Sequence, residues 1–103
     1  MWSSGYLAQA ADGEEELDFV ALEAVTTDAS SHTEILCVPA KLSGIAFLVD
    51  CDDNTAVANR GSLYELGSAN TIDQSTASGS AHGFMAYATK GAAADKQLIG
   101  FFY

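Results

Sequence analysis

Short apolar runs separated by turn residues dominate the second half of the chain. A turn at Arg60-Gly61 leads into a strand that carries Leu63, Tyr64 and Leu66. Further strands are expected over residues 69–74, 83–89 and 98–103. Short strands bounded by glycine, serine, asparagine and aspartate are typical of small sandwiches and barrels. The pattern therefore predicts an all-β fold, a small single-domain β-barrel or β-sandwich.

Three apolar segments in the first half predict more strands. Residues 17–25 carry apolar groups on both faces, so we expect a strand that is buried on both sides. Residues 32–39 are expected to return as a strand that Pro39 ends, because proline cannot donate within a ladder. Residues 41–50 are the most hydrophobic segment and predict the centre of the sheet, with a bulge or bend at Gly44.

Polar and glycine-rich stretches predict the connections. Residues 26–31, 75–81 and 90–96 are expected to form a turn, a surface loop and a hairpin loop. Residues 1–13 sustain no period and predict an arm or a short edge strand, ahead of a single β-barrel domain over residues 14–103. Trp2 and Tyr6 on this arm are expected to dock, either on the core of the domain or on a neighbouring subunit.

The chain is short and strongly acidic. Its 103 residues are 49% hydrophobic and carry a net charge of −10, from four basic and fourteen acidic side chains. This balance argues against nucleic acid and anionic membranes as partners, because binding to phosphate needs lysine and arginine. The longest apolar run, residues 45–49, is too short for a membrane span, and no signal peptide is visible. We therefore expect a protein made in a reducing cytoplasm.

Candidate ligands for a metal are few. Asp50, Asp52 and Asn54 place oxygen atoms at alternate positions, but the calcium-loop spacing fails beyond them, and such residues also form turns. Cys37 and Cys51 lie in apolar runs, so buried free thiols are expected, and a disulfide between neighbouring strands is the alternative. We predict no metal site and no cofactor.

Candidate catalytic groups are equally sparse. Ser75, Ser78 and Ser80 lack the glycine-flanked elbow of a nucleophilic serine. His32 and His82 have no orienting partner in the sequence. Without a convergent acid, base or nucleophile, the chain is expected not to be an enzyme.

Three pairs of segments, taken in order, carry a family resemblance. They are residues 21–25 with 33–39, 60–66 with 69–75, and 83–89 with 98–102. Over residues 17–103 this pattern of strands and turns resembles small capsid decoration proteins of tailed bacteriophages, which are also called head-stabilising or cement proteins. Those proteins are short β-barrel or β-tulip-like domains that bind the outside of an assembled HK97-type shell.

The resemblance implies a virion protein on the capsid exterior, made in the host cytoplasm. Its implied partners are the major capsid protein and further copies of itself, with trimers at local threefold positions as one arrangement. The family has no catalytic residues to transfer. The candidate contacts to the capsid or to a second subunit are aromatic: Trp2, Tyr6, Phe101, Phe102 and Tyr103. The last three are also expected to form the closing strand.

Two alternative functions remain open at this point. One is a different structural β-domain of a viral head or tail. The other is a small ligand-binding β-barrel, with a pocket lined by Phe84, Tyr87 and residues 101–103. Aromatic residues at strand spacing are more often core than pocket, which favours the structural role.

Overall fold

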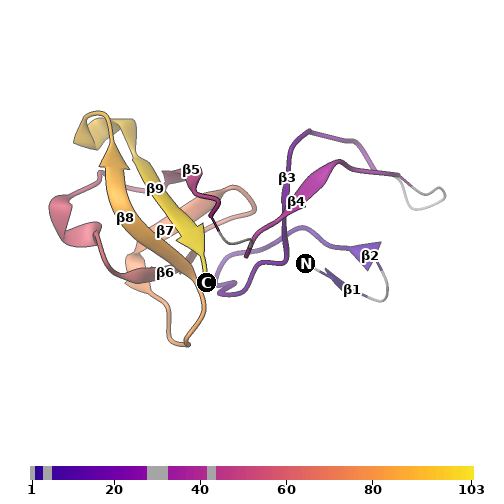
Figure 1. Ribbon diagram of the computed structural model, residues 1–103, viewed down its shortest axis with the longest axis horizontal. Coiled ribbons are helices and arrows are strands. Elements are labelled where there is room, and N and C mark those ends of the chain that lie inside the picture. Colours follow the sequence, from indigo (N-terminus) through magenta and orange to yellow (C-terminus); the bar gives the residue numbers. More distant parts are fainter. Residues whose placement is uncertain (1, 4–5, 28–32, 42–43) are drawn as a thin grey trace.

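A computed structural model describes residues 2–3, 6–27, 33–41 and 44–103, and for residues 2, 3 and 6 it describes the backbone alone. The described chain contains strands and two short 3-10 helices, and no α-helix (Figure 1). The elements are β1 (Trp2–Ser3), β2 (Tyr6–Leu7), β3 (Phe19–Ala21), β4 (Cys37–Pro39), β5 (Phe47–Cys51), η1 (Val57–Asn59), β6 (Leu63–Leu66), β7 (Thr71–Ala77), β8 (Phe84–Lys90), η2 (Ala93–Asp95) and β9 (Gln97–Phe102). The predicted all-β class is confirmed.

Five strands close into a barrel in the order β5-β7-β6-β8-β9. All neighbours are antiparallel except β5 and β7, which run parallel through the pairs Asp50↔Thr71 and Cys51↔Ile72. The longest ladder joins β8 to β9, and β9 also pairs with β5. The strand expected at the end of the chain therefore closes the barrel.

Side chains fill the interior of the barrel. Along β9 every second residue is buried, which is the alternation that a strand with one face inward requires. Phe84 and Leu98 are fully buried, with 0% of their surface exposed. The ring of Phe102 meets Phe84 edge-on with centroids 5.2 Å apart, and it meets Phe47 at 5.4 Å. These geometries are the favoured ones for aromatic pairs, so the three rings pack as core.

The predicted turn at Arg60-Gly61 is confirmed. Gly61 has φ +80, in the left-handed region that glycine adopts without the steric cost of a side chain. Its N–H donates to the carbonyl oxygen of Ala86 at 2.6 Å, and this bond ties the turn to β8. The turn thereby sets where β6 starts along the barrel wall.

The strands before residue 47 lie outside the barrel, whereas we expected one barrel over residues 14–103. Strands β1 and β2 form one two-stranded sheet, and β3 and β4 form another. We call these two sheets the N-terminal layer. The layer extends to one side of the barrel (Figure 1), and the molecule measures 46 × 26 × 26 Å along its principal axes.

The prediction of a doubly buried strand over residues 17–25 is wrong. The strand there is β3, which is only three residues long, and its residues are half-buried or exposed. The β3–β4 sheet has two short strands and meets the core near Leu17 and Ala40, so most of its residues stay partly exposed, which explains the difference. The strands expected over 32–39 and 41–50 are likewise shorter, because β4 starts at Cys37 and β5 at Phe47.

The predicted connections are confirmed only in part. The loop expected over residues 75–81 is shorter, because β7 continues to Ala77 and pairs there with Tyr64. The hairpin loop before β9 contains the 3-10 helix η2. Gly44 lies in a turn with φ +82, as expected of a bend before β5. Most of the turn expected over 26–31, and the start of the strand expected at His32, lie outside the described residues.

A short segment fastens the N-terminal layer to the barrel. The N–H of Gly13 donates to the carbonyl oxygen of Leu66, and the N–H of Leu66 donates to that of Glu14, both at 2.8 Å. Leu17 is buried in the same core as the barrel residues, and so is Ala40, which directly follows β4. The layer is thus held at its base, where these residues meet the end of β6.

Candidate functional site

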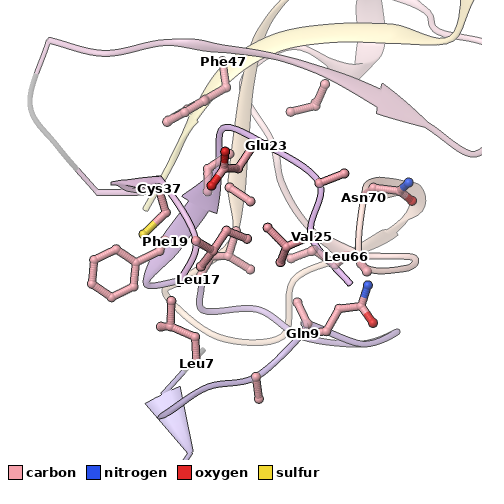
Figure 2. A pocket seen from close by; sticks show the side chains of 18 of the residues that line it. Leu7, Gln9, Leu17, Phe19, Glu23, Val25, Cys37, Phe47, Leu66 and Asn70 are labelled. Atoms are coloured by element: carbon pink, nitrogen blue, oxygen red, sulfur yellow. The ribbon is translucent and has the colours of Figure 1, made fainter. Parts of the chain in front are cut away.

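An open cleft of about 1460 Å³ separates the N-terminal layer from the barrel (Figure 2). Residues from β3, β4 and the segment after β2 form one wall. Residues of β5 and the start of β7 form the other, and the ends of β6 and β9 lie between them. The side chains that define it include Leu7, Leu17, Phe19, Val25, Cys37, Phe47, Leu66 and Asn70.

The cleft is apolar inside and acidic at its edge. Leu17, Leu66 and Phe102 are buried core residues that also border it. The charged residues among its described lining are Glu23, Glu34 and Asp50, all exposed, and that lining contains no lysine, arginine or histidine. The side chain of Glu23 accepts a hydrogen bond from the N–H of Leu36 at 2.9 Å, which holds this carboxylate at the β4 side.

One wall of the cleft contains a free strand edge. Of β5, only Asp50 and Cys51 pair with β7, whereas the ladder to β9 covers residues 47–50. Among the described strands, residues 47–49 therefore have a neighbour on one side alone. Residues 47–49 and 69–71 all line the cleft, so this edge opens into it. Backbone N–H and C=O groups on such an edge can pair with another strand.

Exposed leucines mark the outer part of the N-terminal layer. The N–H of Leu22 donates to the carbonyl oxygen of Leu36 at 2.9 Å, so these two residues are neighbours across the β3–β4 sheet. Leu22 has 61% and Leu36 has 63% of its surface exposed. We call them the leucine pair. The two adjacent side chains form a small apolar patch on the surface of this sheet.

The structure separates the aromatic residues that the sequence grouped as contacts. Phe102 is buried and belongs to the core. Phe101 is half-buried and Tyr103 is exposed, with their ring centroids 6.2 Å apart. All three border a second hollow of about 450 Å³, beside Lys41 and residues 44–46. The side chains of Trp2 and Tyr6 lie outside what the structure describes.

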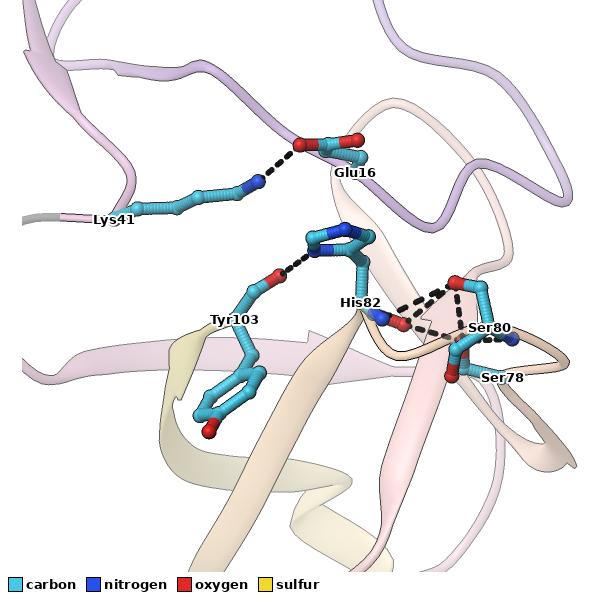
Figure 3. Close-up of polar contacts among 6 residues, drawn as sticks. All are labelled: Glu16, Lys41, Ser78, Ser80, His82 and Tyr103. Carbon is cyan, nitrogen blue, oxygen red and sulfur yellow. Dashed lines mark hydrogen bonds and ion pairs between the residues drawn. The ribbon is translucent and has the colours of Figure 1, made fainter.

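The serine and histidine side chains near residue 80 do not form a catalytic pair (Figure 3). His82 Nδ1 donates to the carbonyl oxygen of Tyr103 at 3.2 Å, so this ring nitrogen is directed at the backbone of Tyr103 and not at a serine hydroxyl. The hydroxyls of Ser78 and Ser80 both donate to the carbonyl oxygen of His82. A hydrogen bond from Ser80, followed by one from the N–H of Gly79, lowers the pKa of Glu15.

These contacts hold a loop in place. Beside them, Lys41 in the turn after β4 forms an ion pair with Glu16, which joins this turn to the segment at the base of the layer (Figure 3). The polar groups around residue 80 therefore have structural partners, as expected for loop serines.

A group of carboxylates that the sequence did not reveal lies on the barrel surface. Oxygen atoms of Asp12, Glu65 and Asp73 lie within 4.8 Å of one another. Glu65 and Asp73 are direct partners across β6 and β7, so two like charges face each other. The three positions are far apart in sequence, and only the register of β6 against β7 brings them together.

Hydrogen bonds and a neighbouring carboxyl group shift the pKa values around Asp73. Bonds from the hydroxyls of Ser75 and then Thr76 lower the pKa of Asp73 to about 2. Burial, and then the negative charge of Asp73, raise the pKa of Asp52. A protonated Asp52 can donate to the Asp73 carboxylate, which explains why the two shifts have opposite signs.

Both cysteines are free thiols, as expected, but only one of them is buried as predicted. Cys51 is buried, and Cys37 is half-buried at the cleft. Burial raises the pKa of Cys51, and its thiol lies 3.4 Å from the carbonyl oxygen of Asp53. In the calcium-like segment, the side chains of Asp52 and Asp53 accept backbone N–H groups, of Gln74 and Asn54 respectively, which is the role of turn residues.

The cleft is larger than the second hollow beside Phe101 and Tyr103. It combines an apolar interior, an acidic edge and a free strand edge. An extended peptide could contact all three of these features. No helix in the described part of the chain is long and apolar enough to cross a membrane. Comparison of the chain with protein-family models, with curated proteins and with solved structures found no significant match in any of the three.

Proposed function

We propose that this protein is a non-enzymatic structural protein that binds the outer surface of a tailed-phage capsid and stabilises it. The observation that carries the proposal is the leucine pair, Leu22 and Leu36, exposed on a two-stranded sheet that projects from a filled barrel. A two-stranded sheet alone is marginally stable in water. A partner that covers the leucine pair would stabilise both the sheet and the complex.

The filled barrel supports a binding role outside the barrel. Phe84 points into the core, whereas Tyr87 on the same strand is exposed, so the two residues do not line one pocket. Inside the barrel, the ring of Phe102 packs against the rings of Phe47 and Phe84, which leaves this part of the interior filled. These observations favour the structural role over a small-molecule carrier.

The acidity of the chain is compatible with this role. A net charge of −10 limits contact with the packaged genome and keeps unbound copies apart in solution. Once copies are held on a lattice, each gains stability from its partner by mass action. The major capsid protein is the proposed partner on one side, and a second copy of this chain is the proposed partner on the other.

The proposed contact between copies uses Tyr103, with Phe101 behind it. Tyr103 is 56% exposed beside the second hollow, and aromatic side chains are favoured at interfaces. Light scattering of Tyr103→Ser should show a lower mass than the parent protein if this contact forms oligomers in solution. Tyr87→Ser is the matched control because Tyr87, on β8, is 52% exposed and lies outside that hollow.

The test of the function is co-sedimentation with undecorated heads assembled from the major capsid protein of the same virus. We expect saturable binding with a fixed number of copies per head. The double variant Leu22→Ser/Leu36→Ser should lose binding, whereas Val57→Ser should keep it, since Val57 is 71% exposed on the barrel at η1. If the parent protein binds neither intact nor undecorated heads, that result contradicts the proposal.

Truncation of the arm provides a second test, and the truncated protein must keep the contacts that fasten the N-terminal layer to the barrel. Removal of residues 1–13 would take away Ala10, which packs on the core, and the bond from Gly13 to Leu66. Removal of residues 1–7 keeps both. If the arm contacts the shell, the shorter truncation should lose affinity for heads while its melting temperature stays close to that of the parent.

A further inference from the structure

We propose that the cleft binds an extended peptide segment of a partner protein, rich in apolar and basic residues, as an added strand on the free edge of β5. The docking mode is argued from the geometry of the cleft. That the segment belongs to the shell subunit rests on the function proposed above.

The size of the cleft favours a peptide over a small molecule. Pockets for drug-sized ligands measure about 300–1,000 Å³. The cleft measures about 1460 Å³ and runs between two sheets, open to solvent. An elongated occupant can contact both walls along that length, whereas a compact ligand would leave much of the apolar lining wet.

The backbone of β5 specifies the form of the occupant. Residues 47–49 bond to β9 on one side and have no described strand on the other, which faces the cleft. The parallel pair of β5 and β7 covers two residues, Asp50 and Cys51, so the gap begins where that pair ends. An extended segment can continue the sheet there through main-chain hydrogen bonds, as in strand addition to other exposed edges.

The side chains around the edge specify its chemistry. An added strand directs alternate residues to opposite faces, so one set would meet the apolar lining formed by Phe47, Val49 and Ile72. The other set would lie near the rim carboxylates, Glu23, Glu34 and Asp50. The described lining contains no cationic side chain to balance these carboxylates, so lysine or arginine in the occupant complements them.

The negative charge of the chain also favours a segment of another protein over a segment of a second copy as the occupant of the cleft. Each copy carries −10 overall and four basic residues in all, of which Lys41 is already paired with Glu16. Insertion of a segment from a second copy would bring acidic surface to an acidic rim. A basic segment of another protein gains energy from the same rim.

The test uses a synthetic peptide in which valine and lysine alternate over about eight residues, a length within the range of ordinary strands. Titrated into isotopically labelled protein, it should shift the amide resonances of residues 47–49 and 69–71 in a saturable way. Amide hydrogen exchange at residues 47–49 should slow, because new hydrogen bonds protect the edge. The same peptide with alternate backbone nitrogens methylated should bind more weakly, since it cannot complete the ladder.

Charge variants separate docking in the cleft from general attraction to an acidic protein. Glu23→Gln/Glu34→Gln should weaken peptide binding by about two- to fivefold for each carboxylate removed. Asp53→Asn/Asp95→Asn removes the same net charge outside the cleft and should have little effect. Glutamine and asparagine keep an oxygen that can accept the hydrogen bonds which Glu23, Asp53 and Asp95 accept now.

Three results would overturn the proposal. The first is a set of resonance shifts that spread over the barrel or centre on Asp12, Glu65 and Asp73. The second is an equal effect of the two double variants on peptide binding. The third is occupation of the cleft by a second copy when no peptide is present. Peptide binding and shell binding are measured separately, so the two proposals fail separately. Heads bound without any peptide binding would remove this inference alone, and peptide bound without heads would remove the proposed function alone.

Discussion

Gly100 lies against Met85 so closely that a Cβ on Gly100 would stand 2.0 Å from the carbonyl oxygen of Met85. The ring of Phe84 would be 2.9 Å away on the inner side. Strands β8 and β9 meet at this point, and the register of their ladder shifts between Ala86 and Ala88 just beyond it. The barrel wall therefore closes around a position that has no room for a side chain.

Gly100→Ala should destabilise the protein by about 1–3 kcal/mol, the usual range for overpacking in a core. Backbone and a fully buried ring must both move to admit the methyl group. The free energy of unfolding, measured by urea denaturation, gives the value. Gly79→Ala is the control because its Cβ would make only an ordinary contact, 3.5 Å from Glu15. Equal stability of Gly100→Ala and the parent would contradict the packing described here.

Leu98→Ala should cost about 2–5 kcal/mol, because Leu98 is fully buried and its loss leaves a cavity in the barrel. Leu48→Ala is the same substitution at a residue with 54% of its surface exposed, and it should change stability by less than about 0.5 kcal/mol. Thermal unfolding followed by circular dichroism ranks the two. A larger loss at Leu48 would mean that β5 is covered in the folded protein, by a second copy or another element.

Glu65→Lys should stabilise the barrel by about 0.2–1 kcal/mol, because it replaces two like charges opposite each other by an ion pair. Asp73 is the cross-strand partner, and Asp12 is the second carboxylate nearby. Added sodium chloride should stabilise the parent protein more than this variant, since salt screens the repulsion that the lysine removes. Glu65→Gln should give a smaller gain. A loss of stability in both variants would show that the facing carboxylates do not repel in the folded state.

Asp73 should make the protein less stable in acid. Its pKa in the folded state is about 2, below the ordinary aspartate value of 3.8. Its contribution to stability is therefore fully present above pH 3.8 and disappears as the pH falls towards 2. Asp52, whose pKa is raised, acts in the opposite direction, since protonation relieves the cost of its charge. Asp73→Asn should therefore flatten the loss of stability between about pH 4 and pH 2.

Urea denaturation across that pH range measures the difference between Asp73→Asn and the parent. Asp53→Asn, in an exposed turn, removes the same charge and should keep the parent's acid dependence. If both variants behave like the parent, the hydrogen bonds from Ser75 and Thr76 do not stabilise the ionised form.

The two cysteines should react with thiol reagents at different rates. Cys51 is buried and its pKa is raised by burial, so little thiolate is available for attack in the native protein. Cys37 is half-buried at the open cleft and should react first. Mass spectrometry after iodoacetamide treatment at pH 8 distinguishes the sites. Both should be labelled in denaturant without a reductant, and failure there would indicate a disulfide.

The sequence predicted the second half of the molecule better than the first, for a physical reason. Strands β6 to β9 bury one face in the barrel. Burial therefore alternates from residue to residue along Leu63–Leu66 and Gln97–Phe102, and the sequence shows the strands. Residues 17–25 look apolar on both faces, yet only part of that surface is buried here. Apolar residues that stay exposed on a thin sheet and apolar residues that fill a core have the same composition.

The candidate site was harder to predict because pairing between distant strands creates it. The free edge of β5 exists because the parallel pair with β7 stops after two residues, and no local signal encodes that length. The three carboxylates at Asp12, Glu65 and Asp73 meet through the register of β6 and β7. Of the predicted aromatic contacts, Tyr103 remains available at the surface, whereas Phe102 became core because β9 alternates.

The closing pair of β5 and β9 has a consequence for how the chain folds. Phe47 pairs with Gly100, so the barrel cannot close until nearly all of its sequence has left the ribosome. Pairings between residues so far apart are slow to form, because the entropy of loop closure is lost before the contacts are gained. Until then β5 can pair only with β7, through Asp50 and Cys51, and the nascent chain presents unpaired strand edges. Refolding should accordingly be slower than in helical proteins of this size, and most prone to aggregation before β9 arrives.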